Sequence, residues 1–262
     1  MNFVDTHAHM GDDRLWQGID TYMNEAHFAG ISKIVNINTD RLTLERGLGL
    51  KEKYPWLYNA GATTPHDVEK FGELDFPLFE QMARDRKLIA IGETGLDAFY
   101  KHSPLDLQEH FLRKYFRLAK EVKLPLIIHC REAFPDLFRI AKEEYREQGA
   151  YLPLVIHCFT GTLEEALQAQ DFGWYISFSG IITFKKSNAL RQLISHLYLS
   201  SIFIETDSPY LAPQSIRGEL NRPAFVKETA AYIAKELGKT LEEIAKITEE
   251  NAQRFFCFSN YP

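Results

Sequence analysis

Eight short apolar runs occur along the chain, separated by segments in which apolar residues recur every three or four positions. The runs cover residues 2–7, 32–38, 57–62, 88–93, 124–129, 152–158, 174–179 and 201–206. Continuous branched aliphatic residues are typical of strands buried on both faces, as in parallel sheets covered by helices. Eight strand–helix units therefore predict an α/β fold, a (β/α)8 TIM barrel. A doubly wound sheet with extra strands is the alternative.

Helical patterns fill the gaps between these runs. Residues 105–121 carry apolar side chains at helical spacing, and Ser103 and Pro104 before them suit an N-cap and a first turn. Residues 223–258 predict two helices, the second starting with a capping box of Thr240 and Glu243. No linker, low-complexity tract or internal repeat interrupts the pattern, so we expect one domain over residues 1–262.

Five of the apolar runs end on side chains that can bind a metal ion. The carboxyl ends of the strands are the edge where α/β folds assemble active sites. In the first run two histidines lie two residues apart, so on a strand their imidazoles point the same way. Such a pair alone would also suit the polar face of a surface strand, but the other four run ends favour a metal site. The candidates are His7, His9, Glu93, His129, His157 and Asp207.

Composition narrows the classes of protein that fit. The 262 residues are 45% hydrophobic and 25% charged, which suffices for the core of one enzyme-sized domain. The net charge of −6 argues against a generic nucleic-acid coat protein, although not against a nuclease, because bound cations supply local positive charge. The three cysteines, an odd number without zinc-ribbon spacing, indicate free thiols in a reducing compartment.

Targeting signals are not recognisable in the sequence. The first strand begins almost at Met1, without a basic segment or an apolar signal core, and no apolar stretch approaches the length of a membrane span. We therefore expect a soluble, cytoplasmic protein that does not use a membrane. The sequence implies no obligate protein partner and leaves the oligomeric state open.

Five separate motifs make the chain resemble the TatD family of metal-dependent deoxyribonucleases, within the amidohydrolase superfamily of metal-bearing barrels. The resemblance covers nearly the whole length, and the joint occurrence of the motifs in this order is specific. The motifs are Asp5-Thr-His-Ala-His9, Ile91-Gly-Glu-Thr-Gly-Leu-Asp97, Ile128-His-Cys-Arg-Glu-Ala133, Ile156-His-Cys-Phe-Thr-Gly161 and Glu205-Thr-Asp-Ser-Pro-Tyr-Leu211.

The resemblance implies a binuclear centre and DNA as the substrate. One cation would be held by His7, His9, Glu93 and Asp207, and the other by Glu93, His129 and His157. A bridging Glu93 suits this chemistry because one carboxylate can bring two cations to within about 4 Å. The imidazoles and carboxylates suit Zn²⁺, Mn²⁺ or Fe²⁺, whereas the family is described as Mg²⁺-dependent.

Two aspartates have expected roles beside the ions. Asp207 is expected to act as the general base as well as a ligand, although it could instead cap the turn at Ser208 and Pro209. Asp5 is expected to hydrogen-bond a ligand imidazole.

Substrate contacts are less sharply indicated. Arg131 could hold a phosphate oxygen or pair with a carboxylate such as Glu132, and Asp97 could position substrate or only brace its loop. The resemblance adds Arg217 and Asn221 as substrate-binding candidates.

The chain departs from the family pattern at three places. Glu219 replaces a lysine and Arg222 replaces a glutamate, which moves the positive charge of their loop. An aromatic residue that usually follows Asp97 directly is displaced to Phe99 and Tyr100, and with it a stacking partner for a base.

The leading function is hydrolysis of DNA phosphodiester bonds by metal-activated hydroxide. An ester or amide hydrolase, such as an aminoacyl-tRNA deacylase, is the alternative. A deaminase of the same superfamily fits less well, because the residues after His129 and His157, Cys-Arg-Glu and Cys-Phe-Thr-Gly, do not form the helix-borne His-x-x-Glu motif that carries its proton shuttle. A metal-stabilised, non-catalytic binding protein is the alternative of another class, but structural zinc sites are normally closed by four ligands.

Overall fold

The computed structural model describes residues 1–261, and one parallel sheet of eight strands forms its centre. All eight predicted strands are present. Neighbouring strands follow the order β1, β2, β3, β4, β5, β8, β9, β10. Their bounds are β1 (Phe3–Ala8), β2 (Ile31–Asn38), β3 (Leu57–Gly61), β4 (Ala90–Asp97), β5 (Leu126–Arg131), β8 (Leu154–Ile156), β9 (Tyr175–Phe178) and β10 (Ile202–Ile204).

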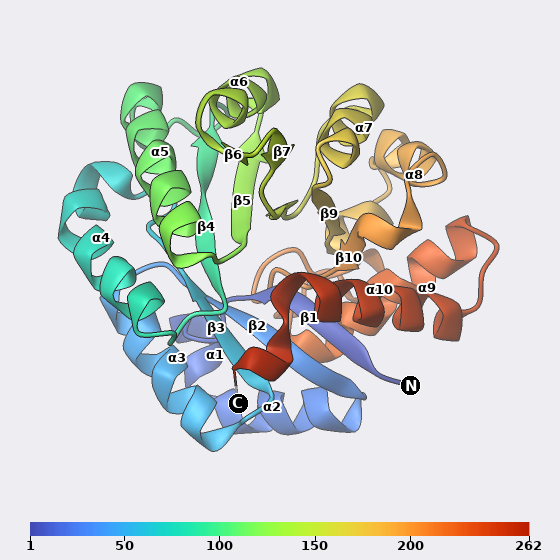
Figure 1. Ribbon diagram of the computed structural model, residues 1–262. Coiled ribbons are helices and arrows are strands. Elements are labelled where there is room, and N and C mark those ends of the chain that lie inside the picture. Colours follow the sequence, from blue (N-terminus) through green and yellow to red (C-terminus); the bar gives the residue numbers. More distant parts are fainter. Residues whose placement is uncertain (262) are drawn as a thin grey trace.

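The sheet curls until its first and last strands meet. Ala8 forms a parallel bridge with Ser208, just beyond β10, and the backbone N–H of Asp207 donates to the carbonyl of His7 at 2.9 Å. The sheet is therefore a nearly closed barrel, and helices surround it (Figure 1). The predicted barrel architecture is confirmed, and the doubly wound alternative is wrong.

Ten α-helices lie among the described residues, most of them in the connections between strands. They are α1 (Asp13–Trp16), α2 (Ile19–Phe28), α3 (Arg41–Lys53), α4 (Val68–Arg84), α5 (Leu105–Val122), α6 (Phe134–Glu144), α7 (Leu163–Asp171), α8 (Asn188–Ile194), α9 (Val226–Glu236) and α10 (Leu241–Phe256). Short 3-10 helices are η1 (Gly180–Thr183), η2 (Leu199–Ser201), η3 (Gln214–Ile216), η4 (Pro223–Phe225) and η5 (Phe258–Asn260). None of the α-helices within residues 1–261 is both long and apolar enough to cross a bilayer.

Helix starts agree with the sequence at one place and differ at another. The capping box of α10 is confirmed, because the Thr240 hydroxyl accepts from the Glu243 N–H at 3.1 Å and the Glu243 carboxylate accepts from the Thr240 N–H at 2.7 Å. At α5 the N-cap is Pro104, not Ser103. The Ser103 hydroxyl instead donates to the carbonyl of His66 at 2.8 Å, so it ties the start of α5 to the loop after β3.

A small hairpin after α6 was not predicted. It pairs β6 (Arg146–Glu147) with β7 (Ala150–Tyr151) in an antiparallel arrangement outside the barrel. Gly149 makes the turn with a φ of +88°, which glycine adopts without the clash that a Cβ would cause.

The barrel interior is packed, which leaves the strand ends as the place for a site. One cluster of buried side chains includes Ile127 of β5, Val155 of β8 and Phe203 of β10, together with Phe255 and Phe256 of α10. Because side chains alternate along a strand, His129 follows Ile127 on the same side of β5. The same spacing relates His157 to Val155.

Candidate metal centre

His7 of β1 and His9 just after it bring their ring nitrogens together. His7 is fully buried, and His9 follows β1 with its side chain 13% exposed. Their Nε2 atoms lie 3.3 Å apart. Two imidazole nitrogens that face each other repel when both present lone pairs, but together they can coordinate one cation.

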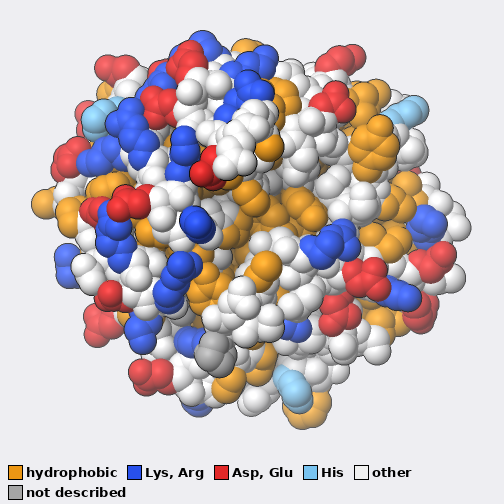
Figure 2. All heavy atoms as spheres, in the orientation of Figure 1, with side chains coloured by type: hydrophobic (Ala, Val, Ile, Leu, Met, Phe, Trp, Pro, Cys, Tyr) orange, Lys and Arg blue, Asp and Glu red, His pale blue; other side chains and the backbone are white. Residues whose placement is uncertain are grey.

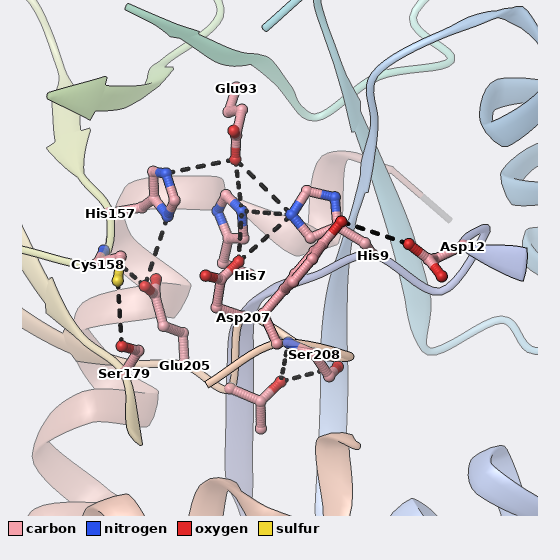
Figure 3. A network of polar contacts seen from close by, with 12 residues as sticks. His7, His9, Asp12, Glu93, His157, Cys158, Ser179, Glu205, Asp207 and Ser208 are labelled. Carbon is pink, nitrogen blue, oxygen red and sulfur yellow. Dashed lines mark hydrogen bonds and ion pairs between the residues drawn. The ribbon is translucent and has the colours of Figure 1, made fainter. Parts of the chain in front are cut away.

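Glu93 places a single carboxylate oxygen among three of these imidazoles (Figure 3). Its Oε2 lies 2.9 Å from His7 Nε2, 3.3 Å from His157 Nε2 and 3.8 Å from His9 Nε2. This oxygen is buried and makes no hydrogen bond of acceptable geometry within residues 1–261. An unsatisfied buried carboxylate oxygen is costly, so the arrangement fits a bound cation.

Two glycines of the Glu93 motif let β4 approach β5 closely. Gly92 and Gly95 have φ values of +145° and +147°, which side-chain-bearing residues rarely adopt. A Cβ on Gly95 would overlap the carbonyl of His129, its partner in the β4–β5 ladder. The glycine spacing therefore sets how near Glu93 comes to the histidines of β5 and β8.

The other two candidate histidines, His129 and His157, form a second group with Glu93. His129 Nδ1 lies 3.4 Å from His157 Nε2, and Glu93, His129 and His157 each offer one ligand atom within 4.8 Å of the others. The ring of His157 also stacks on that of His7, with centroids 3.9 Å apart and planes 6° from parallel. The two donor groups are thus contiguous.

Asp207 completes the first group from the segment after β10. Its Oδ1 lies 3.3 Å from His9 Nε2 and 3.6 Å from His7 Nε2. Its backbone is in the left-handed region, with a φ of +57°, and is held there by the N–H bond to His7. His7, His9 and Asp207 each offer one ligand atom within 4.8 Å of the others.

The buried charges in this cluster stabilise one another. Burial alone would raise the pKa of Glu93, but His157 and His7 outweigh it and hold that pKa well below its usual range. Asp207 has a lowered pKa for the same reasons, with His9 as its main partner. Burial opposes a charged His157, yet Glu93 and Glu205 raise its pKa to about 9.

Glu205 is a site residue that sequence reasoning assigned no role. It is fully buried, its Oε1 lies 3.6 Å from His157 Nδ1, and it accepts the backbone N–H of Cys158 at 2.6 Å. A carboxylate on Nδ1 leaves Nε2 of His157 free to coordinate. The signal in the sequence that could have identified Glu205 is its position two residues before Asp207.

His66 is a second residue that was missed. It lies in the loop after β3, where its Nε2 is 3.7 Å from Asp97 Oδ2 and its ring centroid is 5.1 Å from that of His129. His66, Asp97 and His129 form another group with ligand atoms within 4.8 Å. Four residues of loop separate His66 from the end of β3, so it does not follow its apolar run directly.

Asp5 does not take the position expected for it. Its carboxylate accepts from the Thr206 hydroxyl at 2.6 Å, the Thr206 N–H at 2.9 Å and the His7 N–H at 3.3 Å. Within the described chain, no hydrogen bond joins Asp5 to an imidazole. Burial raises the pKa of Asp5 to about 8. Asp5 therefore fastens β1 to the segment that carries Asp207, and the expected bond to a ligand ring is wrong.

Asp97 braces its loop and orients a histidine, and it has no exposure for direct substrate contact. Its Oδ1 accepts from the N–H groups of Phe99 and Tyr100 at 2.9 and 2.7 Å, and its Oδ2 lies 2.9 Å from His129 Nε2. Burial opposes the charge of Asp97, but His129 and the Tyr100 N–H lower its pKa to about 2. Of the two roles considered for Asp97, the structure supports bracing.

The candidate substrate residues of the 217–222 loop lie away from the cavity. Asn221 is fully buried and donates to the carbonyls of Thr206 and Tyr210 at 2.8 and 2.5 Å, so its expected role in substrate contact is wrong. Arg217 is exposed, with its guanidinium 4.1 Å from the ring centroid of Phe184, and it does not line the cavity.

The two charge exchanges in this loop also act outside the site. Arg222 Nε lies 2.5 Å from Glu25 Oε2 of α2, and Arg222 Nη1 lies 3.8 Å from Glu219 Oε2. The exchanged residues therefore pair with one another and with a neighbouring helix, and neither lines the cavity over the histidines.

That cavity has a volume of about 680 Å³ and opens over the cluster. Its walls include His9, Glu93, His129, His157 and Asp207. Arg131 lies on its rim, with no carboxylate of the described residues within 4.0 Å, so the alternative pairing with Glu132 is absent. The site can thus admit a ligand to a set of nitrogen and oxygen donors that suits divalent cations.

Comparison with known proteins agrees with this geometry. A family profile described as TatD related DNase matches residues 4–257. "Uncharacterized metal-dependent hydrolase YabD" of Bacillus subtilis is 37% identical over 252 residues, covering 96% of this chain and 98% of that protein. "Uncharacterized metal-dependent hydrolase YcfH" of Escherichia coli is 32% identical over 264 residues, covering 98% and 96%.

A solved structure extends the similarity to three dimensions. The crystal structure of YjjV, a TatD homologue from Escherichia coli, superimposes with a TM-score of 0.90 at 29% identity and covers 99% of this chain and 98% of that one. The profile, the relatives and the barrel with its histidine and carboxylate cluster agree, and the chain belongs to the TatD family of metal-dependent hydrolases.

Proposed function

We propose that this protein hydrolyses phosphodiester bonds, most favourably in DNA, with two divalent cations bound at the cluster. His7, His9 and Asp207 would hold one cation, His129 and His157 would hold the other, and Glu93 would contribute to both. The observation that carries this proposal is the position of Glu93 Oε2, 2.9 Å from a nitrogen of the first group and 3.3 Å from a nitrogen of the second. One carboxylate within reach of both donor groups could serve two cations about 4 Å apart, the separation found in two-metal sites.

The ions, when bound, lower the pKa of water and neutralise charge on the phosphoryl oxygens. The chain supplies the base. Asp207 has a lowered pKa and is ionised at neutral pH, so its carboxylate can accept a proton from the water that attacks phosphorus. As the new P–O bond forms, the P–O bond to the neighbouring nucleotide breaks, and the proton can return to the departing alcohol oxygen.

Two further carboxylates keep the histidines in the required tautomers. Asp97 accepts from Nε2 of His129 and so leaves Nδ1 facing the site, where it lies 3.4 Å from His157 Nε2. Glu205 lies beside Nδ1 of His157 and leaves Nε2 facing Glu93. Each ring is therefore oriented before a cation arrives, which lowers the entropic cost of binding.

The rim of the cavity favours a phosphate over a neutral ester. Arg131 offers a guanidinium that no described carboxylate neutralises, and a guanidinium matches two phosphate oxygens. The net charge of the chain is −6, and basic and acidic side chains are interspersed on the face shown in Figure 2, which is the α10 side of the barrel and not the side of the cavity. We therefore expect local contacts near the cluster to bind the substrate, without a broad basic surface.

A metal-reconstituted assay tests the proposal. Protein loaded with Zn²⁺, Mn²⁺ or Mg²⁺ is incubated with single-stranded DNA, duplex DNA, RNA, a chromogenic phosphodiester and aminoacyl-tRNA, and the product ends are mapped. We expect cleavage of DNA and of the phosphodiester. Deacylation of aminoacyl-tRNA without phosphodiester cleavage would show that the protein is an ester hydrolase and not a phosphodiesterase. Metal binding without turnover of any substrate would favour a binding protein.

A further inference from the structure

One polar side chain interrupts the apolar face of α5. Gln108 is 1% exposed and lies on the helix face that also buries Leu112 and Tyr115. A buried amide is costly unless its polar atoms are hydrogen-bonded. Here the amide binds the backbone of the segment after β4. Its Oε1 accepts from the N–H of Asp97 at 2.7 Å, and its Nε2 donates to the carbonyls of Asp97 and Ser103 at 3.2 and 2.8 Å.

Gln108 takes the place of a strand that ends early. Among the described residues, β3 pairs with β4 only at Ala90 and Ile91, whereas β4 continues to Asp97. Beyond Ile91 that edge of β4 has no strand ladder. At Asp97 the side-chain amide accepts from the N–H and donates to the carbonyl, as the backbone of a neighbouring strand would.

The residue held in this way orients a proposed metal ligand. Asp97 is fully buried, and its Oδ2 lies 2.9 Å from His129 Nε2. With Asp97 on Nε2, the Nδ1 of His129 faces His157 in the second donor group. Hydrogen bonds on both the N–H and the carbonyl of Asp97 fix the direction in which its side chain leaves β4. Gln108 therefore acts on His129 through Asp97.

Gln108 also holds a second loop beside the site. The Ser103 carbonyl accepts from Gln108, and the Ser103 hydroxyl donates to the carbonyl of His66 at 2.8 Å and accepts from the N–H of Glu69 at 3.2 Å. His66 Nε2 in turn lies 3.7 Å from Asp97 Oδ2. One buried amide thus joins the loop after β3 to the segment after β4.

We infer that Gln108 is a positioning residue of the second donor group, Glu93, His129 and His157. It holds Asp97 so that His129 carries its proton on Nε2 and presents Nδ1 to a cation. This inference rests on the proposed function, which makes His129 a ligand. Affinity for one of the two cations then depends on a helix side chain outside the barrel that touches neither cation nor substrate.

Gln170 of α7 supplies a matched control. It is 7% exposed, its Oε1 accepts from the N–H of Tyr198 at 2.9 Å, and its Nε2 donates to the Tyr198 carbonyl at 3.0 Å and to Ser201 Oγ at 2.8 Å. It therefore binds loop backbone in the same way as Gln108. Neither Gln170 nor Tyr198 lines the cavity over the donor groups. Gln108→Leu and Gln170→Leu thus remove equivalent hydrogen bonds beside the site and away from it.

Three measurements compare these variants with the wild type. They are the Tm of metal-free protein, the tautomer of His129 by ¹⁵N NMR of metal-free protein at about pH 8, where an ordinary imidazole is neutral, and Zn²⁺ binding by isothermal titration calorimetry. The His129 signals are assigned by their loss in His129→Asn. We expect both leucine variants to lower Tm alike, because each loses the bonds of one buried amide.

Only Gln108→Leu should change the other two measurements. The fraction of His129 with its proton on Nε2 should fall, and one of the two Zn²⁺ binding events should weaken by about 10-fold or more, the usual loss when a residue that orients a metal ligand is removed. Gln108→Met keeps the unbranched shape of the side chain without the amide and should behave in the same way, which guards against a folding defect of the leucine variant.

The outcomes separate this inference from the proposed function. An unchanged His129 tautomer in both Gln108 variants would overturn the positioning role. Equal losses of Zn²⁺ affinity in Gln108→Leu and Gln170→Leu would also overturn it, because Gln108 would then act only on stability. Wild-type protein that binds fewer than two cations would instead refute the two-cation site of the proposed function, while the tautomer of metal-free protein would still test Gln108.

Discussion

Glu93 and Asp207 face the same histidines but from different surroundings. The contacts of Glu93 Oε2 reach both donor groups, whereas Asp207 contacts only His7 and His9. An amide at position 93 would remove negative charge between two cations, whereas an amide at position 207 would remove negative charge beside one cation. We therefore expect the two substitutions to have different effects on metal binding. The two carboxylates can therefore be told apart by conservative amide substitutions.

The first prediction concerns Glu93→Gln. The neutral amide removes one negative charge from between the two donor groups, so bound metal or turnover should fall by at least about 10-fold. Substitution of residues that only hydrogen-bond to metal ligands already causes losses of this size. Metal content by mass spectrometry and hydrolysis of a chromogenic phosphodiester measure the two quantities. Unchanged values of both would show that Glu93 is not shared.

The second prediction concerns Asp207→Asn. The amide oxygen can still face a cation but cannot accept a proton at neutral pH, so single-turnover DNA cleavage should fall by about 10²–10⁴-fold. Metal stoichiometry should fall much less, because His7, His9 and Glu93 remain. Parallel losses of metal and turnover would reduce Asp207 to a plain ligand.

The positions of site side chains were predictable from the sequence only where a residue ends an apolar run. His129 and His157 could be placed in this way. The contacts of Asp5, Asp97 and Glu205 could not, because each depends on how two distant segments approach. Asp5 lies next to Thr206 only once the barrel has closed, which no local pattern encodes.

Among the elements, β4 and β5 determine the geometry of the site. The sequence predicted a strand over residues 88–93, but β4 continues to Asp97 because both glycines of its motif adopt extended conformations with positive φ beside β5. Glycine lowers the strand propensity of a segment and so counts against predicting a strand there. Here close approach of two backbones requires it, so the end of β4 could not be predicted from propensity.

The third prediction tests this close approach with Gly95→Ala. An added Cβ would overlap the His129 carbonyl at a φ of +147°, so we expect a loss of more than about 2 kcal/mol in the free energy of unfolding, together with reduced activity. Urea denaturation provides the measurement. Gly49→Ala in α3 has no neighbour within 4 Å of its Cβ and should be neutral or slightly stabilising. Equal behaviour of the two variants would contradict this account of β4.

At the scale of the whole molecule, the barrel gathers donors that are far apart in the chain. His7 and Asp207 are separated by 200 residues, yet they are joined by a backbone hydrogen bond of 2.9 Å. The (β/α)8 architecture and the shared edge of strand ends were predictable, because eight buried strands in one chain have few other arrangements. The cluster exists only in the folded barrel, so its ligands bind the folded state and not the unfolded chain.

The fourth prediction follows from this linkage between binding and folding. A ligand at 100 times its Kd stabilises the state that it binds by about 2.7 kcal/mol, which raises Tm by about 5 °C or more in a protein of this size. Adding Zn²⁺ or Mn²⁺ to chelator-treated protein should therefore raise Tm, as measured by differential scanning calorimetry. Glu93→Gln should shrink the increase, whereas Phe28→Ala should leave it unchanged, because it removes an exposed ring of α2 that does not line the cavity. The same Tm with and without metal would contradict a cation site built from these residues.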